Sequence, residues 1–324
     1  MAIPILSVQD LTMHYTTRKG DVSAVDGVSF DLEPGKSLGL VGESGCGKTS
    51  VAFSLMRLLP DNAHVKSGHI FIGDTDILSL SHEEMLKFRW QRVAMVFQAA
   101  MNALNPVYRV GDQIIEALDL HWNIVSREQA RERVAQLFNL VGLDPKLMDR
   151  YPHEFSGGMR QRAIIAMALA CNPDVIIADE PTTALDVIVQ DRILRELRQI
   201  QDKLGMAMIY ISHDIAVIAE VSDQIGVMYA GRMAELAESA NIFERPMHPY
   251  TFALMSAFPS IKGEKHALTT LPGEPPDLLH PPSGCRFHPR CPRATELCRE
   301  TQPPFEDKGG GHFVACWHPM EAKR

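Results

Sequence analysis

The sequence predicts an α/β protein whose parallel sheet is covered by helices, with a helical insert. Apolar runs that suit buried strands occur at Val175–Ala178 and Met208–Ile211, and between them an apolar stripe repeats at helical spacing until Gly205. Such alternation of strand and helix is typical of parallel sheets. Residues near 80–170 show mainly helical patterns, which predicts the insert.

The two ends of the chain have other patterns. Three short apolar strands separated by turns are predicted near the N-terminus, at Ile5–Val8, Val22–Val25 and Val28–Leu32. From about residue 245 Pro and Gly become frequent and apolar periodicity is weak, so this stretch needs a cross-link to be ordered. We therefore expect a domain over residues 1–250, with a helical subdomain at about 99–170, and a C-terminal extension over 251–324.

Charge and hydropathy argue against some classes of protein. The 324 residues carry a formal net charge of −8 with a pI near 5.9, which argues against a broad nucleic-acid-binding surface. No apolar run approaches the roughly 20 residues that a membrane-spanning helix needs, and the N-terminus lacks the basic start of a signal peptide. We therefore expect a cytosolic protein that relies on other chains for any work in a membrane.

A phosphate-binding motif follows a predicted strand. The run Gly42–Thr49 matches G-x-x-x-x-G-K-[ST], with strand Ser37–Val41 before it and a helical pattern after it. The glycines let successive backbone amides face one centre, where the helix start adds positive potential. Lys48 would reach the β- and γ-phosphates of ATP, and the Thr49 hydroxyl would ligate Mg²⁺. The candidate ATP-binding residues here are Gly42, Ser44, Gly45, Cys46, Gly47, Lys48, Thr49 and Ser50.

Two carboxylates follow the predicted strand Val175–Ala178. Asp179 and Glu180 would lie at its carboxyl end, the edge of a parallel sheet at which ligands bind. Asp179 is placed to hold Mg²⁺, directly or through water, and Glu180 to orient or polarise the attacking water. An isolated Asp-Glu pair is commonly an acidic turn, so this assignment depends on the phosphate motif in the same chain.

The first motif also occurs in kinases and GTPases, so it does not define the class of protein by itself. A second phosphate-binding segment distinguishes between these classes. Ser156, Gly157 and Gly158 stand at the start of a predicted helix, where a hydroxyl, bare backbone donors and the helix dipole meet. Two such segments in one chain indicate that two chains share each nucleotide.

Residues from about 5 to 250 resemble the nucleotide-binding domain of ABC transporters, with these motifs in the family's order and spacing. The resemblance implies a P-loop NTPase (RecA-like) core with an N-terminal antiparallel β subdomain and the helical insert. It also implies that Ser156, Gly157 and Gly158 grip the γ-phosphate bound to the opposite subunit. Phe155 and Met159 replace the usual Leu and Gln of this signature, and neither change removes the serine or the glycines.

Four further residues gain a role from this resemblance. Tyr15 resembles the aromatic residue that stacks on adenine, and Gln98 the glutamine that couples Mg²⁺ to the transmembrane interface. Asp186 matches the loop that communicates between the two sites, and His213 the switch histidine at the γ-phosphate. Plainer alternatives are a half-buried strand residue for Tyr15, a core histidine for His213 and loop surface for Gln98. The implied catalytic residues are Glu180, His213 and Gln98, and the implied Mg²⁺ ligands are Thr49, Gln98 and Asp179.

Four cysteines crowd near the C-terminus, at Cys285, Cys291, Cys298 and Cys316, which in a reducing cytosol indicates a metal site rather than disulfides. Their wide spacing leaves both zinc and an iron–sulfur cluster open. Together with His248–Thr251 and Leu271–Gly273, they resemble the C-terminal extension of oligopeptide/dipeptide-importer ATPases, in which four such cysteines can hold a [4Fe-4S] cluster. The resemblance thus favours the cluster, with Zn²⁺ as the alternative. We interpret the nearby histidines as surface residues, namely His288, His312 and His318.

The resemblance implies an ATP-hydrolysing subunit of an oligopeptide or dipeptide importer, peripheral at the cytoplasmic face of the inner membrane. Its expected partners are a second, different ABC ATPase subunit, two transmembrane permease subunits and, indirectly, an extracytoplasmic solute-binding protein, without nucleic acid. The cargo contacts no residue of such a subunit, so oligosaccharides, nickel or other solutes stay open. A non-transport ABC ATPase fits less well, because the chain has one cassette, no extended heptads and an acidic balance.

Overall fold

The computed structural model describes residues 3–97, 103–122, 126–182, 186–256 and 273–320. The chain forms two compact units. The first comprises Met1–Leu6, Asp31–Ser37 and Phe71–Tyr210, and the second comprises Ser7–Phe30, Leu38–Ile70 and Ile211–Arg324. Within the described ranges, no helix has the length and apolar character that crossing a bilayer requires.

Parallel strands form the core of the first unit, in the order β8-β7-β6. β6 (Val93–Val96) pairs in parallel with β7 (Val175–Asp179), and β8 (Ala207–Ile211) continues the order. Every residue of these strands is buried, as expected where helices cover both faces of a parallel sheet. The sequence-based positions of β7 and β8 are confirmed to within one residue.

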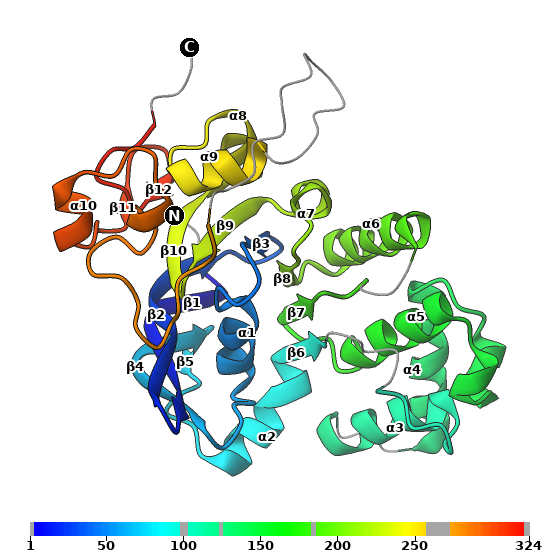
Figure 1. Ribbon diagram of the computed structural model, residues 1–324. Helices are drawn as coiled ribbons and strands as arrows, with labels where there is room; N and C mark the ends of the chain where they lie inside the picture. The colour runs from blue at the N-terminus through cyan, green and yellow to red at the C-terminus, as the bar shows by residue number, and fades with distance from the viewer. Residues whose placement is uncertain (1–2, 98–102, 123–125, 183–185, 257–272, 321–324) are drawn as a thin grey trace. The chain divides into compact units, whose positions relative to one another are not determined.

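Helices make up most of the rest of the first unit. α3 (Val110–His121), α4 (Arg127–Leu140) and α5 (Gly157–Ala168) contact one another (Figure 1), and Leu118 and Phe138 between them are fully buried. The predicted helical insert is therefore confirmed. The remaining helices of this unit are α2 (His82–Gln91), the 3₁₀ helices η2 (Pro145–Asp149) and η3 (Pro152–Glu154), and α6 (Val187–Leu204).

Local signals in the sequence set the ends of these helices. Ser81 and Glu84 form a reciprocal capping box at the start of α2, and the Ser126 hydroxyl accepts the Gln129 amide N–H at the start of α4. At the other end of a helix, Gly205 closes α6 with a φ of 66°, in the left-handed region that favours glycine. The predicted stop at Gly205 is confirmed.

The N-terminal strands form an antiparallel sheet in the order β2-β1-β4-β5. β1 (Leu6–Thr17) and β2 (Gly20–Leu32) are much longer than the three short strands predicted, so that prediction of strand length is wrong. Asp10 (φ 48°) and Gly27 (φ 64°) interrupt the apolar alternation like turns, yet the strands continue through them, as at β-bulges. The other strands are β4 (Ala63–Ile72) and β5 (Thr75–Asp76).

A further set of paired strands in the second unit carries both the phosphate loop and the C-terminal extension. β3 (Ser37–Val41) pairs in parallel with β9 (Gln224–Tyr229), and β10 (Arg232–Glu238) pairs antiparallel with β9. The helices of this unit are α1 (Lys48–Met56), α7 (Ile215–Val221), α8 (Ser239–Glu244) and α9 (Pro249–Ser256).

The C-terminal extension adds two strands to this set. β12 (Phe313–Val314) pairs antiparallel with β10, and β11 (Glu306–Asp307) pairs with β12, so the orange and red segments lie beside yellow β10 in Figure 1. The Ala315 amide N–H also donates to Ala234 O at 2.9 Å. The extension therefore belongs to the same compact unit as the phosphate loop. Its helical elements are η4 (His288–Arg290) and α10 (Glu296–Glu300).

One histidine of the extension differs from the sequence interpretation. His312 is buried, and its Nε2 lies 2.6 Å from Oε1 of Glu235 on β10, which is itself fully buried. The interpretation of His312 as a surface residue is wrong, because a buried carboxylate requires polar partners and His312 supplies one of them.

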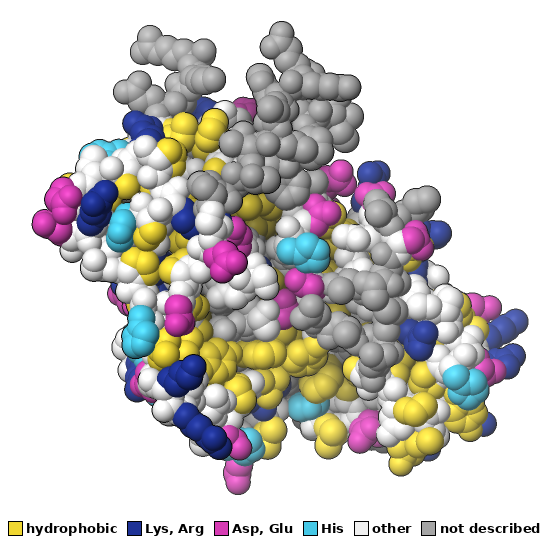
Figure 2. Space-filling view, in the orientation of Figure 1, with side chains coloured by type: hydrophobic (Ala, Val, Ile, Leu, Met, Phe, Trp, Pro, Cys, Tyr) yellow, Lys and Arg dark blue, Asp and Glu magenta, His cyan; other side chains and the backbone are white. Residues whose placement is uncertain are grey.

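Acidic and basic side chains are interspersed over the described part of the face that Figure 2 shows. In the first unit, Arg127 pairs with Asp112 and Arg131 with Asp149, each at 2.9 Å and both exposed. Exposed pairs of this kind contribute at most about 1 kcal/mol each to stability.

Candidate active site

The phosphate loop between β3 and α1 depends on glycine at two close backbone approaches. A Cβ at Gly42 (φ 147°) would lie 2.2 Å from the carbonyl oxygen of Met228, and one at Gly47 (φ 107°) would lie 2.3 Å from that of Ala24. Any other residue at either position would have to displace a neighbouring strand. The loop therefore has a defined shape that the surrounding backbone imposes.

Positive charge is concentrated where this loop meets helix α1. Lys48, the first residue of α1, is buried, and its Nζ donates to Gly42 O at 2.7 Å and to Glu43 O at 3.1 Å. The amides of the first turn of α1 add to this potential, and no acidic residue lies in that turn. Burial raises the pKa of the adjacent Cys46 thiol, so Cys46 adds no negative charge. The loop is thus suited to bind an anion such as a triphosphate.

Two more predicted site residues belong to the same unit. Tyr15 on β1 is half-buried, and its hydroxyl lies 3.2 Å from the hydroxyl of Ser50 on α1, so the structure brings it to the helix that follows the phosphate loop. His213 is exposed just after β8, which does not agree with the alternative of a core histidine. Its neighbour Ser212 is buried and accepts the Asp214 amide N–H at 3.0 Å.

The carboxylate pair lies in the first unit, at the carboxyl end of β7. Asp179 is the last residue of this strand and is buried. Glu180 follows with a φ of 47°, an uncommon conformation for a residue other than glycine. Such strain is of order 1–3 kcal/mol and tends to occur at functional sites. Glu180 therefore has a strained backbone directly after the buried Asp179.

The Ser-Gly-Gly segment and Asp186 also lie in the first unit, each at the start of a helix. Ser156 is exposed and caps α5, where its hydroxyl accepts the Met159 amide N–H at 3.3 Å. Asp186 is exposed and caps α6 through the Val189 amide N–H at 3.0 Å. A Cβ at Gly158 would come within 3.2 Å of Val189, so glycine permits this approach of α5 to α6.

Phe155, one of the two unusual residues of the signature, is buried. It thus serves as a hydrophobic anchor in place of the usual leucine, and the exposed hydroxyl of Ser156 is unaffected. Gln98 lies outside the described residues, as do Ala184 and Leu185, so the structure gives no position for them.

Gln113 on α3 fixes the loop that precedes this helix, Asn105–Tyr108. The side chain of Gln113 accepts the Asn105 amide N–H at 2.8 Å and donates to Asn105 O at 3.1 Å and to Tyr108 O at 3.2 Å. This ties the loop at both ends, although Val107 is 70% exposed and Tyr108 is 58% exposed. The loop therefore presents two exposed apolar side chains on a fixed backbone.

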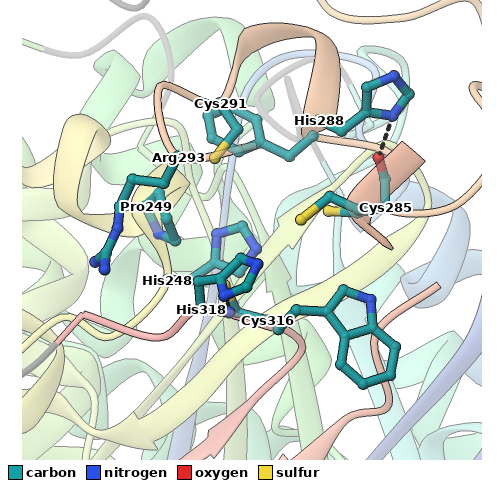
Figure 3. A pocket seen from close by; sticks show the side chains of 11 residues that line it. His248, Pro249, Cys285, His288, Cys291, Arg293, Cys316 and His318 are labelled. Carbon is teal, nitrogen blue, oxygen red and sulfur yellow. Dashed lines mark hydrogen bonds between the residues drawn. The ribbon is translucent and has the colours of Figure 1, made fainter. Parts of the chain in front are cut away.

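All four C-terminal cysteines line one pocket of the second unit. Figure 3 shows Cys285 and Cys291 on one side of this pocket and Cys316 on another, and Cys298 completes the set. All are free thiols. The His288 ring is hydrogen-bonded to the backbone oxygen of Cys285 at 3.0 Å. In the described part of the chain, no three His, Cys, Asp or Glu side chains are arranged to hold a metal ion.

Burial and backbone hydrogen bonds act in opposite directions on the pKa of three of these thiols, and the effect of burial is the larger. Burial raises the pKa of Cys285 and of Cys316 to about 11, and burial also raises the pKa of Cys291. Against this, backbone hydrogen bonds from the residues two positions later lower the pKa of each of these thiols; the donors are Phe287, Arg293 and His318. Amide donors to sulfur are a feature of cysteine-bound metal centres, where they stabilise thiolate charge. Cysteine sulfurs with amide donors are thus of the chemical type that a thiolate-bound group uses, while their raised pKa keeps them protonated without one.

A glycine loop closed by Lys48, the Asp179–Glu180 pair after a buried strand and Ser-Gly-Gly at a helix start together define the ATPase class of ABC transporters. A family model described as ABC transporter matches residues 25–183. A second, described as oligopeptide/dipeptide transporter, C-terminal region, matches residues 234–298.

Curated relatives match over almost the whole chain. The oligopeptide transport ATP-binding protein OppD of Escherichia coli (strain K12) is 45% identical, covering 98% of this chain and 94% of that protein. The dipeptide transport ATP-binding protein DppD of Bacillus subtilis (strain 168) is 47% identical, covering 97% and 94%. The chain belongs to this family of oligopeptide and dipeptide transport ATP-binding proteins.

Solved structures give the same fold. A dimeric ATP-binding cassette, MJ0796, in a post-hydrolysis state with ADP and Pi has a TM-score of 0.64 at 25% identity, over 72% of this chain and 98% of that one. The cbiO1 protein of Clostridium perfringens, part of the ABC transporter complex cbiONQ, has a TM-score of 0.65 at 26% identity, over 75% and 91%. The predicted P-loop NTPase fold is thus confirmed.

Proposed function

We propose that this chain hydrolyses ATP to drive the import of oligopeptides or dipeptides through separate transmembrane subunits. The observation that carries the proposal is its 45–47% identity to peptide transport ATP-binding proteins over nearly the full length of both chains. The match includes the C-terminal region particular to oligopeptide/dipeptide transporters. Import of an oligosaccharide, nickel or another solute is the alternative.

We assign the chemistry to the residues that the sequence motifs predict. Backbone amides of the phosphate loop and Lys48 hold the triphosphate, and Tyr15 stacks on adenine. Thr49, Asp179 and Gln98 would hold Mg²⁺, which neutralises charge on the β- and γ-phosphates when bound. Glu180 orients the attacking water and receives its proton as the oxygen bonds to the γ-phosphorus. The bond to the bridging oxygen then breaks, which releases ADP and phosphate, and His213 contacts the γ-phosphate.

We infer that each nucleotide is shared between two chains. Ser156, Gly157 and Gly158 are accessible at the start of α5, where they can grip a γ-phosphate held by a second subunit, and Asp186 would communicate between the two sites. The dimeric cassette among the structural relatives supports a dimer. For this chain we propose a different ABC ATPase as the partner, which gives a heterodimer.

We place the chain at the cytoplasmic face of the inner membrane, bound peripherally to two permease subunits. The fixed loop at Asn105–Tyr108, with Val107 and Tyr108 exposed, is the surface we assign to them. A solute-binding protein would act only indirectly. In domain terms, we assign residues 1–250 to ATP binding, with a helical subdomain at about 99–170, and residues 251–324 to the extension.

We further propose that Cys285, Cys291, Cys298 and Cys316 hold a [4Fe-4S] cluster, with Zn²⁺ as the alternative. Four free thiols on one pocket, three of them with backbone hydrogen bonds, support a thiolate-bound group. Such a group would cross-link the extension, whose short elements provide little apolar core of their own.

The function is tested with Glu180→Gln in the reconstituted transporter. We expect the variant to bind Mg-ATP normally, to lose about 100-fold or more in turnover and to accumulate as a closed dimer, because the water loses its proton acceptor. The measurements are nucleotide affinity, phosphate release and sedimentation. Brisk hydrolysis by the variant would contradict the role of Glu180. In the unmodified transporter, ATPase stimulation by oligosaccharide or nickel, and not by peptides, would contradict the peptide assignment.

A further inference from the structure

The segment between Cys285 and Cys291 sends a buried arginine to the phosphate loop. Arg290, next to Cys291, forms a bidentate ion pair with Glu43, with Nη1 2.6 Å from Oε2 and Nη2 3.0 Å from Oε1. The Arg290 side chain is only 6% exposed. Glu43 is the second residue of the phosphate loop, between Gly42 and Ser44. The extension therefore contacts the loop directly.

The backbone of Glu43 is held as well as its side chain. Its amide N–H donates to the hydroxyl of Tyr250 on α9 at 2.9 Å, and its carbonyl oxygen accepts from Lys48 Nζ at 3.1 Å. Tyr250 is fully buried. The carboxylate, the amide and the carbonyl of one loop residue thus each have a partner, which fixes the orientation of the peptide groups beside it.

Aromatic packing fixes Arg290 in turn. Its Nη1 donates to the Tyr229 hydroxyl at 3.3 Å, and its guanidinium carbon lies 5.8 Å from the centre of the Tyr229 ring. The Tyr229 ring packs on Tyr250 at 4.7 Å and on Phe287 at 5.1 Å between ring centres. A planar guanidinium held in this way keeps its bidentate geometry, which a lysine does not reproduce.

The negative charge of Glu43 opposes the binding of an anion by the phosphate loop unless a cation neutralises it. Glu43 carries a carboxylate on a loop that is suited to bind a triphosphate, and an unpaired carboxylate there would repel the phosphates. In a partly buried site such repulsion is screened less than in water. Arg290 neutralises that carboxylate and holds it on the side of the extension.

We propose that Arg290 is a positioning residue of the ATPase: through Glu43 it fixes the phosphate loop and removes a negative charge that opposes ATP binding. The C-terminal extension thereby supports nucleotide binding in the same chain. The proposal rests on the ATPase function of the family and not on which group the four cysteines hold.

The test compares Arg290→Met, Arg290→Lys, Glu43→Gln and the double variant Glu43→Gln/Arg290→Met in the full-length protein. The probes are Mg-ATP binding by a fluorescent ATP analogue and, with the partner subunits, KM and kcat. We expect Arg290→Met to weaken ATP binding about tenfold and to raise KM more than it lowers kcat. Arg290→Lys keeps the charge and should weaken binding less. In the Glu43→Gln background, Arg290→Met should have little further effect, because the charge that it neutralises is absent.

Arg286→Met is the matched control. Arg286 lies in the same segment, is buried and pairs with Asp26 on β2 instead of with Glu43. Equal losses of ATP affinity in Arg286→Met and Arg290→Met, in proportion to lowered melting temperature, would reduce Arg290 to a structural role and overturn the proposal. The proposal would also be overturned if Arg290→Met weakened ATP binding equally in the unmodified protein and in Glu43→Gln. If Arg290→Met does not fold, Arg290→Lys takes its place. An increase in KM caused by Arg290→Lys that is equally large in the Glu43→Gln background would overturn the proposal.

Discussion

Two glycines of the phosphate loop differ in what a methyl group would meet. At Gly42 a Cβ would lie 2.2 Å from Met228 O, whereas at Gly45 (φ 79°) nothing lies within 4 Å of it. Gly42→Ala must therefore displace β9 or the loop, and we expect more than about a tenfold loss of Mg-ATP affinity. Gly45→Ala meets only the left-handed backbone penalty of about 1–2 kcal/mol. Isothermal titration with ATP measures both variants.

The comparison separates steric contact from backbone conformation. If Gly42→Ala and Gly45→Ala weakened ATP binding equally, the close approach to Met228 would not determine the shape of the loop. Unfolding midpoints of both variants provide the control, because a general loss of folding would lower affinity in either case.

Residues that carry chemistry were predictable where the reaction requires a residue type at a fixed spacing. The sequence predicted the glycines and Lys48 of the phosphate motif, and the structure shows the glycines in a loop before α1 and Lys48 as the first residue of α1. The partner of Glu43 was not predictable, because Arg290 is 247 positions away and no local spacing connects the two. The one available signal was an arginine placed among spaced cysteines.

Strands that are buried on both faces were predictable, because they appear in the sequence as continuous apolar runs. β7 and β8 are wholly buried, so their apolar runs identified them, whereas Asp10 and Gly27 made the long strands β1 and β2 look like short ones. The pairing of β12 with β10 was not predictable, because a strand of two residues carries no periodicity. That pairing depends on tertiary context.

The start of helix α9 gives the second unit a sensitivity to acid. His248 is buried, and its Nδ1 accepts the Tyr250 amide N–H at 3.0 Å, which only a neutral imidazole can do in this tautomer. Burial lowers the pKa of His248 to about 4, although Glu235 opposes the shift. Because the unfolded chain takes up a proton near pH 6.5, this contribution to stability is complete above that pH. It is lost as the pH falls toward 4.

We therefore expect His248→Gln to reduce the loss of stability between pH 7 and pH 5, because glutamine can accept the Tyr250 amide N–H without titrating. The loss attributable to His248 is at most about 3 kcal/mol by pH 4. Urea unfolding at each pH measures it. His312→Gln is the control, since His312 also contacts Glu235. An unchanged pH slope in His248→Gln would show that other groups cause the acid sensitivity.

For the molecule as a whole, the phosphate loop and the four-cysteine pocket belong to one compact unit, so the group that we propose for the pocket would stabilise the unit that carries the phosphate loop. We expect protein purified without oxygen to be brown, with iron and sulfide in equal amounts. Cys291→Ser should remove the colour and lower the melting temperature, because the extension loses its cross-link. Metal analysis and absorption spectra measure this.

Cys171→Ser is the matched control for that experiment. Cys171 is also buried, and burial raises the pKa of its thiol to about 11, yet it lies in the first unit and outside the cysteine-lined pocket. It should therefore keep the iron and the colour. Colourless protein with stoichiometric zinc that Cys291→Ser removes would replace the cluster by the zinc alternative. Metal-free protein with an unchanged melting temperature in Cys291→Ser would mean that pairing of β12 with β10 orders the extension without a bound group.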